Sequence, residues 1–201
     1  TVVVYERSNE EAAHGAAKAL LPFRAVWNRR AARDVRNIIE QQHIDAVHIH
    51  NTLLLLSPAV VRAAKKCGVP VVLTLHNFRL FCPNGILLRD GRVCEDCPHH
   101  GLHCALRHRC YRGSLAQTLV VAAAYGLHRR LGTWRGVTMV ALTEFDRQKL
   151  LEFNRQYPMF DADRLVVKPN PVCRAVRPRH PVGRPQKSNA FRRPAGGTQG
   201  S

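Results

Sequence analysis

The sequence predicts an α/β fold in which a parallel sheet is covered by helices on both faces. Short apolar runs that suit strands alternate along the chain with segments of helical periodicity. The runs are apolar at successive positions, which is typical of strands buried on both faces in parallel sheets. A chain of 201 residues with 45% hydrophobic composition can bury a sizeable core, which excludes a wholly disordered protein.

The N-terminal part is expected to begin with a strand, because residues 2–5 are Val-Val-Val-Tyr. The Ala-rich residues 10–21 suit a turn or two of helix. Pro22 should interrupt that helix, since proline has no backbone N–H and clashes with the preceding turn. Over residues 25–42, apolar side chains recur at spacings of three and four, which predicts an amphipathic helix.

Two further strands are expected at residues 46–50 and 70–75, which are both apolar runs. Between them, Ser57 followed by Pro58 is typical of a helix start, because the hydroxyl can cap the helix and proline fits its first turn. Gly68 is typical of the residue that ends a helix.

Residues 77–113 show no periodicity and hold five of the seven cysteines, so we expect an irregular, Cys-rich insertion there. Ser114 should cap the helix that follows, which runs through Leu127. Residues 137–142 form the next apolar run and are expected to be a strand.

Thr143 and Asp146 have the spacing of a capping box, which predicts a helix that continues through Phe153. Residues 164–168 suit a last strand. Residues 173–201 carry seven Lys or Arg side chains and no acidic residue, and they are rich in Pro and Gly. We therefore expect this segment to be a disordered basic tail.

The chain is thus interpreted as one domain, residues 1–172, followed by the tail. Its net charge of +17 suits binding to nucleic acid or to an anionic lipid surface, although a solvated extension is the simpler interpretation of the tail. No run of 18 apolar residues is present, and no secretory signal is visible at the start, so neither a spanning helix nor secretion is expected.

Polar residues follow the predicted strands at the point where each strand ends. In a doubly wound sheet, ligands bind outside the carboxyl ends of the strands. We therefore expect a binding crevice formed by His50, Asn51, His76, Asn77, Thr143, Glu144 and Asn170. His48 is two residues from His50, and we interpret it as a buried core histidine with a satisfied hydrogen bond.

The cysteines of the insertion allow three interpretations. Cys94 and Cys97 have the spacing of a zinc knuckle, and Cys82 and Cys110 would complete four thiolates, with Cys104 spare. Alternative ligands in the same segment are His99, His100, His103 and His108. Disulfides and reduced structural thiols are the alternatives. A structural zinc ion would tie down a long insertion that has little core of its own.

Several segments resemble family 4 glycosyltransferases, in particular DAVHIHN and VVLTLHNFRLFCP. The similar segments are residues 45–51, 71–83, 94–97, 110–114, 141–145 and 167–172, in the order of the family. The segments at 94–97 and 110–114 resemble an insertion found in a bacterial subgroup. The resemblance covers roughly residues 28–172.

The resemblance implies a two-domain GT-B enzyme with Rossmann-like domains and the active site between them. The N-terminal domain would hold the acceptor and the C-terminal domain a nucleotide sugar, and transfer needs no essential metal. His76 matches the family histidine that points into the cleft, where it would bind a sugar hydroxyl or stabilise developing charge. The insertion would lie beside the acceptor.

Two features depart from the family pattern. The glycine-rich loop of the first strand and the second domain with its paired glutamates are not in the sequence, so we expect this N-terminal half to be inactive alone. The resemblance implies polysaccharide biosynthesis on a glycan or lipid-linked acceptor in the cytoplasm, with peripheral contact to the inner membrane as one option. A non-catalytic module that binds an acceptor or partner is the alternative. A zinc-bearing nucleic-acid binder is less favoured, because interleaved aromatics and a reading helix are missing.

Overall fold

The computed structural model describes residues 2–6, 16–53 and 55–170, with only the backbone of residues 16–19. The chain divides into two compact units, Thr1–Pro169 and Asn170–Ser201, and all of the helices and strands named below belong to the first. The expected disordered tail lies outside the described residues. The domain boundary at residue 172 stays a prediction.

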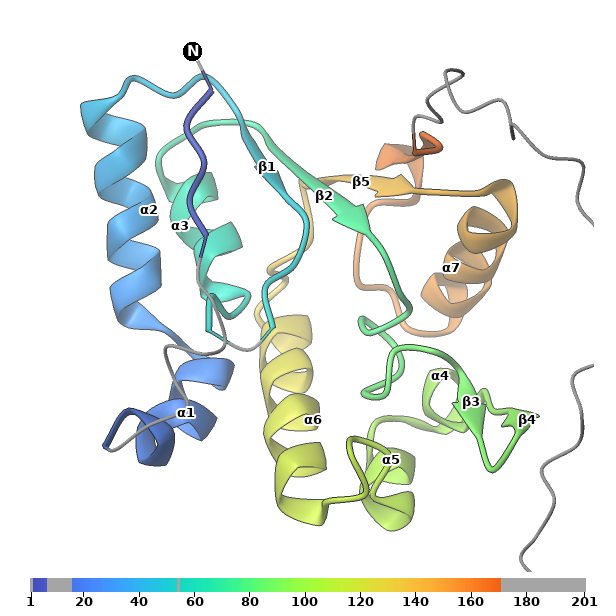
Figure 1. The fold of residues 1–201 in the computed structure, drawn as a ribbon. Helices are drawn as coiled ribbons and strands as arrows, with labels where there is room; N and C mark the ends of the chain where they lie inside the picture. The colour runs from blue at the N-terminus through green and yellow to red at the C-terminus, as the bar shows by residue number, and fades with distance from the viewer. Residues whose placement is uncertain (1, 7–15, 54, 171–201) are drawn as a thin grey trace, which may run out of the picture. The chain divides into compact units, whose positions relative to one another are not determined.

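A four-stranded sheet forms the framework of the first unit (Figure 1). Its strands, in spatial order, are β1 (Val47–Ile49), β2 (Val71–Leu75), β5 (Thr138–Ala141) and β6 (Leu165–Val167). Every neighbouring pair is parallel. The predicted α/β class and parallel sheet are therefore confirmed, together with the last four expected strands.

Helices flank this sheet, and their apolar faces complete the core. The long ones are α1 (Ala16–Val26), α2 (Arg29–Gln41), α3 (Ala59–Lys66), α6 (Leu115–Arg130) and α7 (Glu144–Gln156). Helix α2 packs on α3, α1 on α6, and α7 on β5 and β6, so α2 and α7 lie near opposite ends of the sheet (Figure 1).

The insertion contains short regular elements where an irregular segment was expected. They are an antiparallel ribbon of β3 (Leu88–Arg89) and β4 (Arg92–Val93), then α4 (Asp96–His100) and α5 (His103–His108). The ribbon turns at Asp90 and Gly91, both with positive φ, which is the turn that Asp-Gly favours between two strands. Elements of two to six residues give no periodicity that a sequence could reveal.

The predicted strand at residues 2–5 is wrong. These residues are not in a strand, and Val2 and Val4 are 89% and 73% exposed. The hydroxyl of Tyr5 instead donates to Asp34 of α2 at 2.9 Å. An apolar run becomes a strand only where it finds a partner strand, and composition alone does not reveal one.

The predicted helix over residues 25–42 is two helices. Helix α1 continues through Pro22, which was expected to interrupt it. The packing of α1 on α6 stabilises the helix by more than the loss of the backbone hydrogen bond that proline cannot donate. The next helix begins afresh at Arg29, because the Asn28 side chain accepts from the N–H of Ala31 at 3.0 Å. Residues 10–15 of the first expected helix lie outside the described residues.

Ser57 is not the N-cap that the sequence predicted. Pro58 takes the N-cap position of α3, and Ser57 has a φ of +55°. Its buried hydroxyl accepts from the N–H of Asn28 at 2.9 Å and from that of Ala59 at 3.3 Å. One hydroxyl therefore joins the starts of α2 and α3. The predicted caps at Ser114 and Thr143 are confirmed by bonds from Gln117 and Asp146.

His128 is fully buried on α6 and connects this helix to the end of α1. Its Nε2 lies 3.0 Å from the carbonyl of Val26, which can only accept, so Nε2 carries the proton. Its Nδ1 then accepts from the Thr133 hydroxyl at 2.8 Å, and the ring stacks on Trp27. Burial lowers the pKa of His128 to about 4, because a charged ring would be desolvated here.

We expect His128 to lower the free energy of unfolding in acid. Its native pKa lies below the ordinary value of 6.5, so the unfolded chain binds more protons as pH falls from 6.5 to about 4. The loss should reach up to about 3 kcal/mol. Urea unfolding at pH 7.5, 6 and 5 measures it. His128→Gln should have a lower stability at pH 7.5 but a shallower pH slope. An unchanged slope would contradict this assignment.

Candidate functional site

Two histidines meet at the carboxyl ends of neighbouring strands. His50 directly follows β1 and His76 directly follows β2. In the parallel register Ile49 pairs with Leu73, so His76 lies two residues beyond the position opposite His50, on the same face of the sheet. His50 Nδ1 lies 3.0 Å from His76 Nε2, and the rings stack with centroids 5.3 Å apart. A bond between two imidazole nitrogens needs one N–H and one lone pair, so this bond contains a single proton.

His48 joins this pair and is not the core residue that was expected. It is exposed, and its ring centroid lies 4.4 Å from that of His50. Its Nε2 lies 2.8 Å from the hydroxyl of Thr74 on β2. Partial desolvation lowers the pKa of His48, and the like charges of His50, Lys168 and His76 lower it further. The interpretation failed because β1 lies at one edge of the sheet described here, where alternate side chains need not be buried.

A polar hollow opens beside the histidine pair. Its lining includes His50, Asn51, His76 and Asn77, four of the residues that were expected to form a crevice. Asn51 and Asn77 each accept a bond from the backbone N–H two residues ahead, which turns the chain away from its strand. Their side-chain NH₂ groups can donate hydrogen bonds to a ligand.

Side chains beyond the predicted crevice residues also line the hollow, among them Arg79, Tyr125 and Trp134. Arg79 lines it, and its Nε is buried with no hydrogen-bond partner. Tyr125 of α6 and Trp134 are buried at the hollow and stack with centroids 5.8 Å apart. Burial raises the pKa of Tyr125, so it stays a neutral phenol. Arg79 lies two residues after Asn77, whereas no local pattern pointed to the two aromatic residues.

The other predicted site residues lie elsewhere. The Thr143 hydroxyl caps α7, where it accepts from the Asp146 N–H at 3.0 Å and donates to the Asp146 carboxylate at 2.7 Å. Glu144 pairs with Arg147 at 3.0 Å. Neither residue lines the hollow. Asn170 belongs to the second unit of the chain. Each site assignment remains a prediction.

A comparison with protein families decides which family this is. The model of a glycosyl transferase 4-like domain matches residues 1–171. The chain belongs to the glycosyl transferase 4-like family. The resemblance carried by DAVHIHN and VVLTLHNFRLFCP is thereby confirmed, and the sheet fits the Rossmann-like half of a GT-B fold. No curated protein and no solved structure matches the chain.

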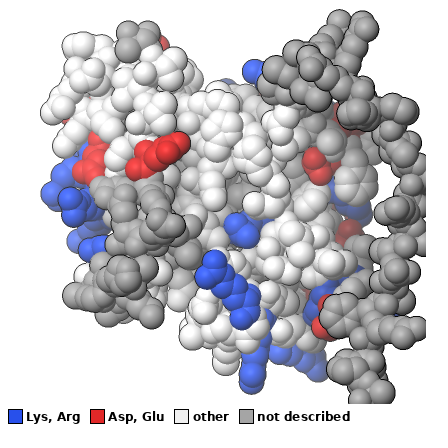
Figure 2. All heavy atoms as spheres, in the orientation of Figure 1, with Lys and Arg blue, Asp and Glu red and all other residues white. Residues whose placement is uncertain are grey.

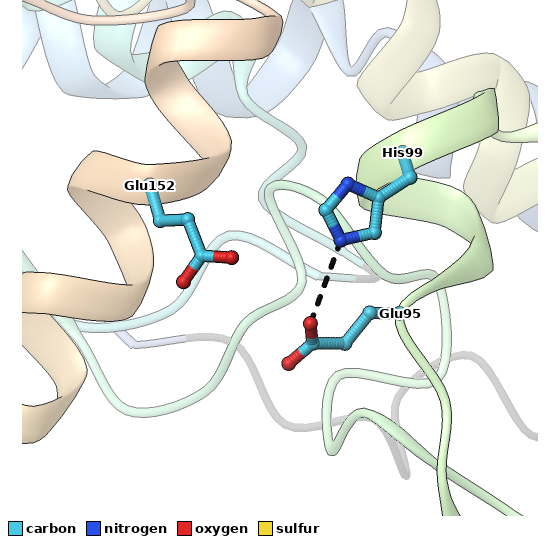
Figure 3. Close-up of side chains that lie close together, drawn as sticks. All are labelled: Glu95, His99 and Glu152. Atoms are coloured by element: carbon cyan, nitrogen blue, oxygen red, sulfur yellow. Dashed lines mark ion pairs between the residues drawn. The ribbon is translucent and has the colours of Figure 1, made fainter.

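The insertion of this glycosyl transferase 4-like domain is fastened to α7 through α4 (Figure 3). Gln156 Nε2 donates to the carbonyl of His99 at 2.8 Å, which orients its amide, and Oε1 then accepts from His99 Nδ1 at 2.8 Å. The ammonium of Lys149 pairs with Glu95 at 2.9 Å and with Glu152 at 3.1 Å. Lys149 is the main cause of a lowered pKa of Glu95.

Glu95, His99 and Glu152 are the one trio of His, Cys, Asp or Glu in the described ranges whose ligand atoms lie within 4.8 Å of one another (Figure 3). The ammonium of Lys149 already bonds both carboxylates. We therefore assign this trio to holding α4 against α7, because a metal ion would have to displace Lys149 from both carboxylates.

The thiols of the insertion are free in the part of the chain that the structure describes. Cys82 and Cys97 are buried, and Cys94, Cys104 and Cys110 are half-buried. Burial raises the pKa of Cys97 to about 12, and the neighbouring Cys82, Cys110 and Cys104 contribute. Burial also raises the pKa of Cys110, with contributions from Cys82 and Cys94. The zinc prediction stays a prediction.

Charge on the surface of the domain is unevenly distributed. Figure 2 shows Lys and Arg over α2 and over the lower part of the view, around α5 and α6, with a largely uncharged middle. An apolar groove between α1 and α6 is lined by Phe23, Trp27 and Leu119, among others. Among the described helices, none combines the length and apolar character needed to cross a bilayer.

We expect Lys149→Met to raise the pKa of Glu95, because the methionine removes the ammonium that stabilises the carboxylate. A pH titration of the Glu95 side-chain carboxyl by carbon NMR measures it. The contribution of the pair exists above the ordinary Glu pKa and is lost as pH falls through the lowered one. The loss of stability at pH 7 should be about 1 kcal/mol or less. Lys66→Met, at an exposed lysine on α3, is the matched control. An unchanged pKa of Glu95 in Lys149→Met would contradict the assignment of Lys149 as its main partner.

Proposed function

We propose that the chain is the acceptor-binding half of an enzyme that transfers a sugar from a nucleotide-sugar donor to a glycan or lipid-linked acceptor. The observation that carries the proposal is the hydrogen-bonded pair of His50 and His76 at the carboxyl ends of β1 and β2, beside a polar hollow. In a Rossmann-like domain this edge of the sheet is where ligands bind.

His76 is the residue that we assign to the reacting hydroxyl. No Asp or Glu is among the residues that line the hollow, so an imidazole is the group there that can accept a proton near neutral pH. His50 is a positioning residue, because its Nδ1 bonds His76 Nε2 and thereby decides whether the other His76 nitrogen donates or accepts. A sugar hydroxyl can serve as either partner.

Arg79 suits a negatively charged part of the acceptor. Its buried Nε has no partner, and a buried unpaired donor is unfavourable until something bonds to it. A phosphate that links a sugar to a lipid offers several strong acceptor oxygens. This is the basis on which we favour a lipid-linked acceptor, reached by peripheral contact with the inner membrane on the cytoplasmic side.

The donor is assigned to a second domain by resemblance to the family. We propose that the chain binds acceptor but does not transfer sugar by itself. Sugar transfer needs no metal ion in this proposal.

The experiment compares binding of the whole chain to a glycan array and to vesicles that contain a polyprenyl-pyrophosphate-linked disaccharide. We expect the vesicles to be bound, and His76→Ala to weaken binding about tenfold, the equivalent of one good hydrogen bond. Arg79→Met should weaken binding to the pyrophosphate-linked sugar and leave binding to the neutral glycans unchanged.

His43→Asn is the matched control, because His43 is exposed and asparagine tolerates its positive φ. It should bind as the unaltered chain does. A chain that binds neither probe, or a His76→Ala variant that binds as well as the control, would overturn the proposal. Titration with UDP-glucose and GDP-mannose should give no binding, and sugar transfer by the chain alone would contradict the assignment of the donor to another domain.

A further inference from the structure

Five cysteines from separate places in the insertion lie in one region of the fold. Cys82 lies in the loop after β2, and Cys94 directly follows β4. Cys97 lies on α4, Cys104 on α5, and Cys110 two residues beyond the end of α5. All five are free thiols in the described residues, and α4 packs on α5.

Contacts around four of these cysteines place them in one region. The guanidinium of Arg79, three residues before Cys82, lies 5.8 Å from the ring centroid of Tyr111, which follows Cys110. Arg89 donates to Asp96 at 2.7 Å, which joins the ribbon that leads into Cys94 to the helix that contains Cys97. That helix, α4, packs on α5, which ends two residues before Cys110. Cys104 has a partner of its own in His103, whose Nε2 lies 3.7 Å from its sulfur. The group that the chain gathers is therefore Cys82, Cys94, Cys97 and Cys110.

The backbone around Cys94 and Cys97 has the layout of a metal-binding knuckle. The tight Asp90–Gly91 turn returns the chain through β4, and the Cys94 N–H donates to the carbonyl of Leu87 at 2.8 Å. Cys97 follows in the first turn of α4. Two cysteines separated by two residues at such a turn can bind one ion together.

The insertion needs more stabilisation than its own elements provide. Its strands have two residues each and its helices five and six, which is too short to persist in isolation. Leu87, Arg109 and Arg112 also have positive φ, which costs about 1 kcal/mol or more for each such residue. A cross-link among the cysteines would offset this cost.

We propose that Cys82, Cys94, Cys97 and Cys110 bind one zinc ion as four thiolates and that this ion holds the insertion together. On binding, the four thiols lose their protons to solvent and form Zn–S bonds, with no change of oxidation state. The bound site has a net negative charge, because four thiolates carry more charge than one zinc ion. No three of the described cysteine sulfurs lie within 4.8 Å of one another, so the sulfurs must move closer together when they bind the ion.

The proposed ion would act on the acceptor hollow through the chain that follows β2. Asn77 and Arg79 line the hollow, and Cys82 lies in the same loop, where the N–H of Phe78 donates to the carbonyl of Gly85 at 2.8 Å. Fixing Cys82 would fix this loop. The zinc proposal does not depend on sugar transfer, and its test measures metal rather than activity.

The experiment measures zinc in the whole chain, purified from zinc-supplemented cells in reducing buffer. We expect about one zinc ion per chain by mass spectrometry of metals. Replacement by Co²⁺ should give the sulfur-to-cobalt charge-transfer band and the intense visible bands of a tetrahedral thiolate site. Cys94→Ser and Cys97→Ser should lose the metal.

Cys104→Ser and Cys67→Ser are the matched controls, since Cys67 lies at the end of α3, outside the insertion. Both should retain zinc and the cobalt spectrum. The cobalt spectrum of the unaltered chain tests the proposal independently of whether Cys97→Ser folds. Zinc absent from the unaltered chain, a cobalt spectrum without the charge-transfer band, loss of metal in Cys104→Ser, or fewer titratable thiols after denaturation without reductant would each overturn it.

Discussion

The parallel pairing of β1 with β2 is the constraint on which the rest of the site depends. Parallel strands end at the same edge of a sheet, and in the register of Ile49 with Leu73 His76 lies two residues beyond the position opposite His50, on the same face. His50 and His76 are 26 positions apart in the sequence, yet their ring nitrogens are within hydrogen-bond distance. A shift of one residue in either strand would turn one of the two rings to the opposite face of the sheet. The pairing of β1 with β2, rather than the histidines themselves, therefore determines the geometry of the histidine pair.

Much of this framework could be predicted because it depends on local patterns. The apolar runs of β2 and β5, and the caps at Ser114 and Thr143, have local signatures, and the structure bears them out. The strand expected at residues 2–5 failed for the opposite reason, since a strand needs a partner that a local pattern does not show. Asn28 was missed as a cap because the apolar period continues across it, while its side chain caps the start of α2.

The candidate site was predictable only in part. Residues directly after a strand, such as His50 and His76, are placed by the strand itself, and both line the hollow. Thr143 also follows a strand, but its hydroxyl caps α7. A hydroxyl that caps a helix and one that binds a ligand have the same local sequence signature. Tyr125 and Trp134 reach the hollow through the packing of α6 and the segment after it, which is a tertiary effect. His48 was assigned to the core because the edge position of β1 was not foreseeable.

The insertion and the hollow are connected through the loop after β2 and through contacts with α7. The loop that starts with Asn77 leads into the insertion, and the insertion returns to α7 through Glu95 and Lys149. Phe81 in that loop packs on Phe153 of α7, with ring centroids 5.5 Å apart. The segment that lines the hollow is thus held by β2 at its start and, after it, by α7, the helix that Thr143 caps. A residue that has no contact with a ligand can in this way determine where the ligand-binding side chains lie.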